Sequence, residues 1–170
     1  MIQEVAVLDS RLPRPLKEPM PHHSLYLFVH ILAACVLFGG HLVMSVIVLP
    51  RAKRAKDPAY FLAFERPFGR LAIPSLAIQA ATGPVLANRF VPPSEWFLWE
   101  NVVQDHIASK LLLLVIIIAM TISMSLRVRP RLLANDPKAF RSAAIHAHTI
   151  TFLSFLMVML GVSLNTGGNW

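Results

Sequence analysis

The chain has 170 residues, of which 55% are hydrophobic and only 15% are charged, whereas about a quarter of the residues of a soluble domain are charged. This composition excludes an ordinary soluble enzyme and indicates one integral membrane domain. The net charge of +7 does not indicate nucleic-acid binding, because the basic residues cluster beside apolar segments, as topology signals do. The single cysteine, Cys35, excludes an intrachain disulfide and any paired-cysteine redox or zinc motif.

The N-terminal segment differs in composition from the rest of the chain. Residues 1–23 contain four prolines, three basic and three acidic residues and no long apolar core, so they are predicted to form an extended arm and not a signal peptide. Residues 24–170 are predicted to form a four-helix transmembrane domain without an evident internal repeat. The predicted spans cover roughly residues 24–50, 68–90, 105–126 and 141–164, each near the length of about 20 residues that crosses a bilayer.

The charges of the connecting segments predict the orientation of these spans. Segments 51–70 and 127–141 are strongly basic, whereas segment 89–105 has one arginine against three acidic residues. Basic loops stay in the cytoplasm, so both termini and segment 89–105 are expected outside. The fold class is therefore an all-α, up-and-down bundle of four transmembrane helices with short connections. The expected location is the inner (plasma) membrane, as a multi-pass protein in contact with lipid.

Two histidines in the first span are the strongest functional signal in the sequence. His30 and His41 lie in a stretch without a charged residue. Eleven helical residues place them about 20° apart on one face and roughly 16 Å apart along the axis. Ionisable groups at membrane depth are costly and usually functional, and histidine is a common metal and haem ligand. The pattern predicts haem iron held between the helices.

Depth in the bilayer suggests partners for both histidines. In the inner half, His41 and His148 have similar depth, so His148 is favoured as a second axial ligand. His146 points about 200° away from His148 and is expected to contact a loop, a haem propionate or a neighbouring subunit. In the outer half, Lys110 matches the depth of His30. Lys110 could neutralise a propionate or extend to the membrane surface.

Short patterns in the first three spans support a family resemblance. The matching residues are His30, Phe38, Gly39, Gly40, Leu49, Pro50 and Arg51 in span one, Arg70, Leu71, Pro74, Thr82 and Gly83 in span two, and Lys110 in span three. With them, most of the chain resembles the CopD/HemJ-type superfamily of four-helix membrane proteins. The resemblance implies a haem b-binding bundle with His30 as a ligand. Members similar to HemJ oxidise protoporphyrinogen IX, and CopD-type members are linked to copper handling.

The leading functional hypothesis is an integral membrane b-type cytochrome. His30 and His41 would each ligate a haem b, so one or two haems are expected, and His148 would complete the inner site. Quinone or another redox partner would exchange electrons with them. This chain lacks the tryptophan that precedes the first-helix glycine in HemJ and adds His41 and His148, which favours an electron-carrying relative.

Three alternatives to a cytochrome remain. A HemJ-like protoporphyrinogen IX oxidase would use Lys110 to bind a propionate. A copper transport or resistance protein would use His22 and His23, although the sequence has no regular methionine array. A structural subunit of a larger membrane complex, or an oligomer, would use the arm and the C-terminal tail as docking segments.

Overall fold

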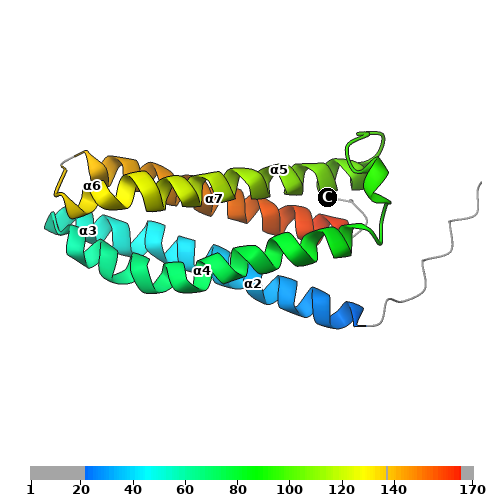
Figure 1. Cartoon of the computed structure of the whole chain (residues 1–170), viewed down its shortest axis with the longest axis horizontal. Coiled ribbons are helices and arrows are strands. Elements are labelled where there is room, and N and C mark those ends of the chain that lie inside the picture. Colours follow the sequence, from blue (N-terminus) through cyan, green and yellow to red (C-terminus); the bar gives the residue numbers. More distant parts are fainter. Residues whose placement is uncertain (1–21, 137, 166–170) are drawn as a thin grey trace, which may run out of the picture.

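The computed structural model describes residues 22–136 and 138–165, and all regular structure in these ranges is helical, without a strand. The predicted arm at 1–23 thus lies almost wholly outside the described residues. The helices, in chain order, are α2 (His23–Val43), η1 (Met44–Val48), α3 (Leu49–Ala55), α4 (Pro58–Ala87), η2 (Pro93–Glu95), α5 (Val102–Ser123), η3 (Met124–Val128), α6 (Arg129–Leu133) and α7 (Ala139–Asn165). Figure 1 shows these elements side by side along one long axis.

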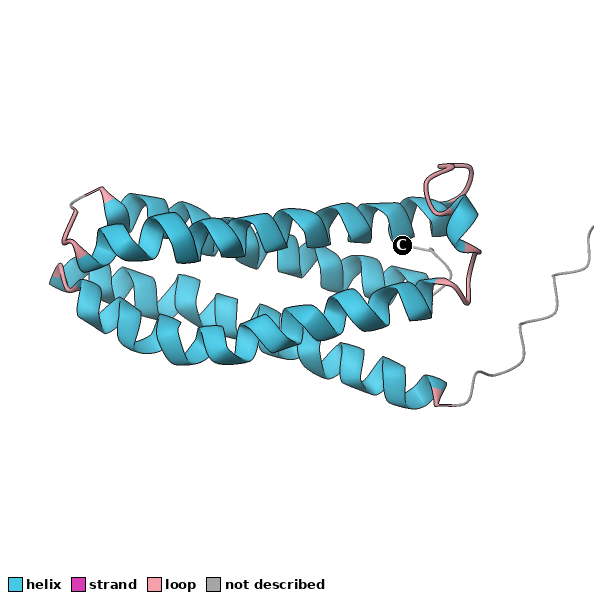
Figure 2. Ribbon diagram, viewed as in Figure 1, coloured by secondary structure: helices cyan, strands magenta, loops and turns pink. Residues whose placement is uncertain are grey.

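Successive helices run up and down this axis (Figure 2). The turns after α3 and α6 lie at one end of the bundle, and the start of α2 and the end of α7 lie at the other (Figure 1). The end formed by α3, α6 and their turns is called the basic end, because seven of the sixteen lysines and arginines of the chain belong to it. Helix α2 packs mainly against α4, α5 packs against α7, and contacts between α2 and α7 join the two pairs, whereas α4 and α5 make few contacts.

Three of the four predicted membrane spans are confirmed as helices that could cross a bilayer. The segments His23–Ala55, Val102–Leu133 and Ala139–Leu164 are long and apolar enough by length and composition. Helix α4 is not among them, since it contains charged residues in its first half and three internal prolines. A membrane-crossing α4 and the placement of the termini outside stay predictions. The structure is compatible with a multi-pass membrane protein.

The connections are shorter than the sequence pattern predicts. Helix α4 begins ten residues before the predicted second span, because Asp57 caps its N-terminus. The carboxylate of Asp57 accepts hydrogen bonds from the backbone N–H groups of Ala59 and Tyr60, and Pro58 occupies the first helical position, where its missing N–H costs nothing. Much of the basic segment assigned to a loop is therefore helical, and its arginines are held in a fixed register.

The bundle consists of four helical rods: α2 with η1 and α3, then α4, then α5 with η3 and α6, and finally α7. The five-residue π-helical segments η1 and η3 interrupt the first and third rods at equivalent points. Each ends two residues before a proline, Pro50 or Pro130. A proline ring clashes with the carbonyl four residues earlier in an α-helix, and a widened π-turn accommodates this clash. The sequences 44–51 and 124–131 are identical at five of eight positions, as Met-Ser-x-x-Val-x-Pro-Arg. The expectation of no internal repeat is therefore wrong for these two helices.

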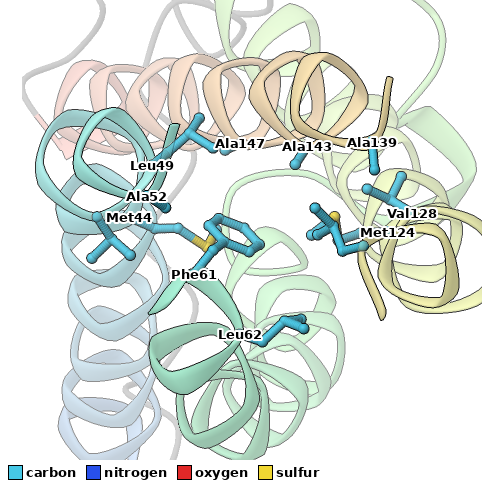
Figure 3. Packing of buried hydrophobic residues seen from close by; sticks show 12 residues of the cluster. Met44, Leu49, Ala52, Phe61, Leu62, Met124, Val128, Ala139, Ala143 and Ala147 are labelled. Atoms are coloured by element: carbon cyan, nitrogen blue, oxygen red, sulfur yellow. The ribbon is translucent and has the colours of Figure 1, made fainter. Parts of the chain in front are cut away.

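The buried residues of the two repeated segments, 44–51 and 124–131, form part of the hydrophobic core at the basic end (Figure 3). Met44 and Met124 are buried, as are Val48 and Val128. They pack with Phe61 and with a set of buried residues from every rod, among them Leu49, Ala52, Leu62, Leu132, Ala139, Ala143 and Ala147. The core thus fixes the four rods relative to one another at the basic end, directly beside His41.

Candidate functional site

A cavity of about 450 Å³ lies beside this core, in the half of the bundle nearer the basic end. All four helical rods contribute to its wall: His41 from α2, the α4 segment from Glu65 to Ile73, Thr121 and Met124 from the third rod, and His146 from α7. The volume falls within the range of about 300–1,000 Å³ that is usual for small-molecule sites. The few contacts between α4 and α5 are consistent with the space between them.

His41 is the best-placed candidate ligand in this cavity. Its side chain is buried, and Nδ1 lies 2.8 Å from the carbonyl oxygen of Leu37. Because a carbonyl can only accept, Nδ1 must carry the proton, and the neutral ring therefore has its lone pair on Nε2. Phe68 fixes the ring from the side, with 4.9 Å between ring centroids and an edge-on angle of 82°. This is the arrangement that orients a metal-ligating imidazole.

Gly40 makes the contact between Phe68 and His41 possible. A Cβ atom at Gly40 would overlap the Phe68 ring, whereas one at Gly39 would meet nothing within 4 Å. The absence of a side chain at Gly40 therefore lets α4 approach α2. Of the two glycines that precede His41 in the sequence, only Gly40 allows the close approach of another helix.

The two glycines provide a matched pair of substitutions. We expect Gly40→Ala to lower the free energy of unfolding by about 1–2 kcal/mol, because displacing a packed ring costs about 1–3 kcal/mol and the higher helix propensity of alanine offsets part of it. Gly39→Ala should leave stability unchanged or slightly higher. Unfolding in mixed micelles with increasing denaturing detergent would measure both. Equal effects of the two substitutions would contradict this packing.

The structure corrects the predicted partner of His41. His148 is exposed on the surface of α7, whereas His146 lines the cavity together with His41. His146 Nδ1 donates to the carbonyl of Ser142 at 2.8 Å, so its Nε2, 3.0 Å from the hydroxyl of Ser123, accepts a hydrogen bond from it. The favoured role of His148 as an inward-facing ligand is therefore wrong in geometry, and His146 is the second imidazole of this cavity.

The inward face of α7 explains this correction. Ala143, Ala147, Ile150 and Ser154 are buried, and their spacing of three or four residues defines one helix face. His146 borders that face on the side of α5, and His148 borders it on the side away from the cavity. Small residues four apart often mark a helix–helix contact in membranes. The alanines at 139, 143 and 147 were the sequence signal that could have placed His146 correctly.

His30 lies outside this cavity, in a hydrogen-bonded contact with α4. Its Nδ1 is 2.7 Å from the hydroxyl of Thr82, which in turn donates to the carbonyl of Ile78 at 2.6 Å. Since the one proton of Thr82 is used there, His30 Nδ1 is the donor and Nε2 holds the lone pair. The amide of Gln79 donates to the backbone carbonyl of His30 at 2.6 Å. Helix α4 thus fixes His30 in the same tautomer as His41.

Lys110 and His30 occupy equivalent positions of the two repeated rods, 80 residues apart. Lys110 is close enough for its charge to act on His30, which agrees with their predicted common depth. Its Nζ lies 3.3 Å from the position that a Cβ at Gly161 would take, so α7 leaves room for the ammonium group. His106, which lies near the same end of the bundle, uses both ring nitrogens, one for the carbonyl of Val102 and one for the hydroxyl of Ser163.

A partly buried ion pair lines the cavity on the side of the basic end. Arg129 binds Glu65 with two hydrogen bonds, Nε to Oε2 at 3.1 Å and Nη2 to Oε1 at 2.7 Å. The Glu65 side chain is 8% exposed and that of Arg129 is 32% exposed. Two more cavity residues, Arg66 and Arg70, are exposed and follow Glu65 on α4. Three guanidinium groups and one carboxylate therefore line this cavity.

A second ion pair at the basic end is a surface feature. Arg131 Nε lies 2.7 Å from Asp136 Oδ2, and both side chains are substantially exposed. The hydrogen bond from the backbone N–H of Lys138, followed by that from Arg131, holds the pKa of the Asp136 carboxyl below its ordinary value. This pair closes the turn after α6 and does not belong to the cavity.

Within the described ranges, no three His, Cys, Asp or Glu side chains come together as a metal site would require. A haem iron needs only one or two protein ligands, so a buried imidazole beside a cavity meets its requirement. No model of a protein family matches the chain, and no match occurs among curated proteins or solved structures.

Proposed function

We propose that the chain is an integral membrane b-type cytochrome that holds one haem in the cavity beside His41. The observation that supports this most is the state of His41: a buried imidazole with Nδ1 bonded to a backbone carbonyl and Nε2 left with the lone pair. Among the hydrogen bonds of the described residues, none uses His41 Nε2, whereas His146 and His106 use both nitrogens.

Several residues of this chain would hold the haem. His41 would hold the haem iron, with Phe68 fixing the plane of the imidazole ring. His146 lines the same cavity and would become a second ligand after giving up its hydrogen bond with Ser123, while Met124 offers a thioether on the same wall. The bound iron would take up and release one electron. The apolar wall of the cavity would exclude water and thereby tune the potential of that exchange.

Orientation and location belong to the same proposal. With basic loops inside, the cavity would lie in the cytoplasmic half of the plasma membrane, and α4 would cross as the fourth span. His30 and Lys110, in the outer half, would then serve a second redox group or quinone. The CopD/HemJ-type resemblance supports His30, whereas the cavity supports His41, so we assign the haem to His41.

The purified full-length protein provides the direct test. Reduced-minus-oxidised absorption spectra should show the α-band of haem b, and a pyridine haemochrome assay should give about one haem for each chain. If the protein emerges without haem, reconstitution with added haem should generate the same band. Absence of the band after reconstitution of folded protein would exclude the proposed function.

A further inference from the structure

Arg66 and Arg70 are two uncommitted cations beside an otherwise largely apolar cavity. They lie four residues apart on α4, so they occupy the same helix face with about 5–6 Å between their Cβ atoms. Both are exposed and both line the cavity. Within the described part of the chain neither arginine forms an ion pair. The ion pairs found there join Arg129 to Glu65 and Arg131 to Asp136.

The charges of this group are unbalanced, because three guanidinium groups line the cavity beside one carboxylate. Like charges four residues apart on a helix destabilise it by a few tenths of a kcal/mol. Arg129 adds a third guanidinium, whose Nη2 lies 3.8 Å from where a Cβ at Gly69 would be, directly between Arg66 and Arg70 in sequence. Among the described residues that line the cavity, Glu65 carries the one carboxylate, and both of its oxygens already accept hydrogen bonds from Arg129.

The arginines of α3 are also exposed at the basic end, but they lie away from the cavity. Arg51 and Arg54 of α3 are exposed and lie at a similar helical spacing, but neither lines the cavity. Their positions fit a role in membrane topology and contact with lipid headgroups. Among the arginines that the structure describes, only the α4 pair combines a charge outside any ion pair with a position on the cavity wall, beside apolar residues such as Phe68 and Ile73.

We propose that Arg66 and Arg70 bind the two carboxylates of a tetrapyrrole whose macrocycle occupies the cavity. Guanidinium groups match carboxylates with paired hydrogen bonds, and a porphyrin carries two propionates on one edge of an apolar ring. The proposal rests on the proposed function in that haem would be the natural ligand, but it concerns the carboxylates and not the iron. Arg66 and Arg70 lie on either side of Phe68 along α4, so the carboxylate edge of the ligand faces α4, and the diacid is selected over its ester.

Metal-free protoporphyrin IX tests this subsite separately from iron ligation. Its fluorescence would be titrated with the full-length protein in lipid nanodiscs, beside its dimethyl ester and beside empty nanodiscs. Hydrogen bonds to charged groups contribute about 1.5–3 kcal/mol, so we expect the wild-type protein to bind the diacid about tenfold or more tightly than the ester. The Arg66→Gln/Arg70→Gln double variant should lose this preference, with unchanged affinity for the ester.

Two controls separate the possible outcomes. Arg51→Gln/Arg54→Gln removes the same charge from the same end of the bundle and should keep the wild-type preference for the diacid. The second control is the ligand itself, because the metal-free ring contains no iron for His41 to bind. Thus a failure of haem ligation by His41 would leave this result intact. The subsite is excluded if the α4 double variant retains the preference, if the α3 double variant loses it equally, or if the wild-type protein binds neither porphyrin.

Discussion

Replacing His41 by alanine should abolish the haem b α-band of the purified protein, whereas His148→Ala should leave it unchanged. The reason is position: His41 is buried on the cavity wall and His148 is exposed on the outside of α7. Reduced-minus-oxidised spectra of the two variants, purified in parallel and normalised to protein, make the measurement. Each substitution removes one imidazole, so a difference between the two spectra reports the position of the removed side chain and not its chemistry.

Two further measurements test the site: a variant of His146, and a rescue experiment that separates loss of the ligand from misfolding. His146→Ala should keep haem bound but shift its spectrum or spin state, because it removes the second imidazole that lines the cavity. Exogenous imidazole should restore the band to folded His41→Ala protein by filling the vacated position. A band that persists in His41→Ala and disappears in His148→Ala would assign the haem to the opposite face of α7 and refute the site.

Arg129→Gln should lower the free energy of unfolding by roughly 2–3 kcal/mol, whereas Arg131→Gln, two residues later in α6, should have no measurable effect. Removing one partner of a buried pair leaves the other charge unpaired and costs several kcal/mol. The cost here is reduced because the Arg129 side chain is about one-third exposed. Exposed pairs such as that of Arg131 with Asp136 contribute little.

Unfolding of the two arginine variants in mixed micelles would measure this difference. Glu65→Gln is the complementary variant, because it keeps the shape and removes the buried charge, and it should cost less than Arg129→Gln. Equal stability of Arg129→Gln and Arg131→Gln would show that the Glu65 pair is fully hydrated. The cavity wall would then not depend on it.

The sequence alone determined that the molecule is helical and contains segments apolar enough to cross a bilayer. Apolar segments of membrane length identified three helices that could cross a bilayer, because length and hydropathy are local properties. The periodicity of a helix likewise placed His30 and His41 on one face of α2. The amide of Gln79 on α4 donates to the carbonyl of His30, since an unpaired buried amide is too costly to persist.

Only the tertiary structure decided which side chains face one another. Depth along the helix axis favoured His148 over His146 as the partner of His41, but depth carries no information on rotation about the axis. The packing of Ala143 and Ala147 against the core set that rotation and turned His148 outward. The position of Arg66 and Arg70 could not be predicted for a similar reason. The sequence pattern assigns both arginines to a loop, whereas the Asp57 cap starts α4 earlier and places them beside the cavity.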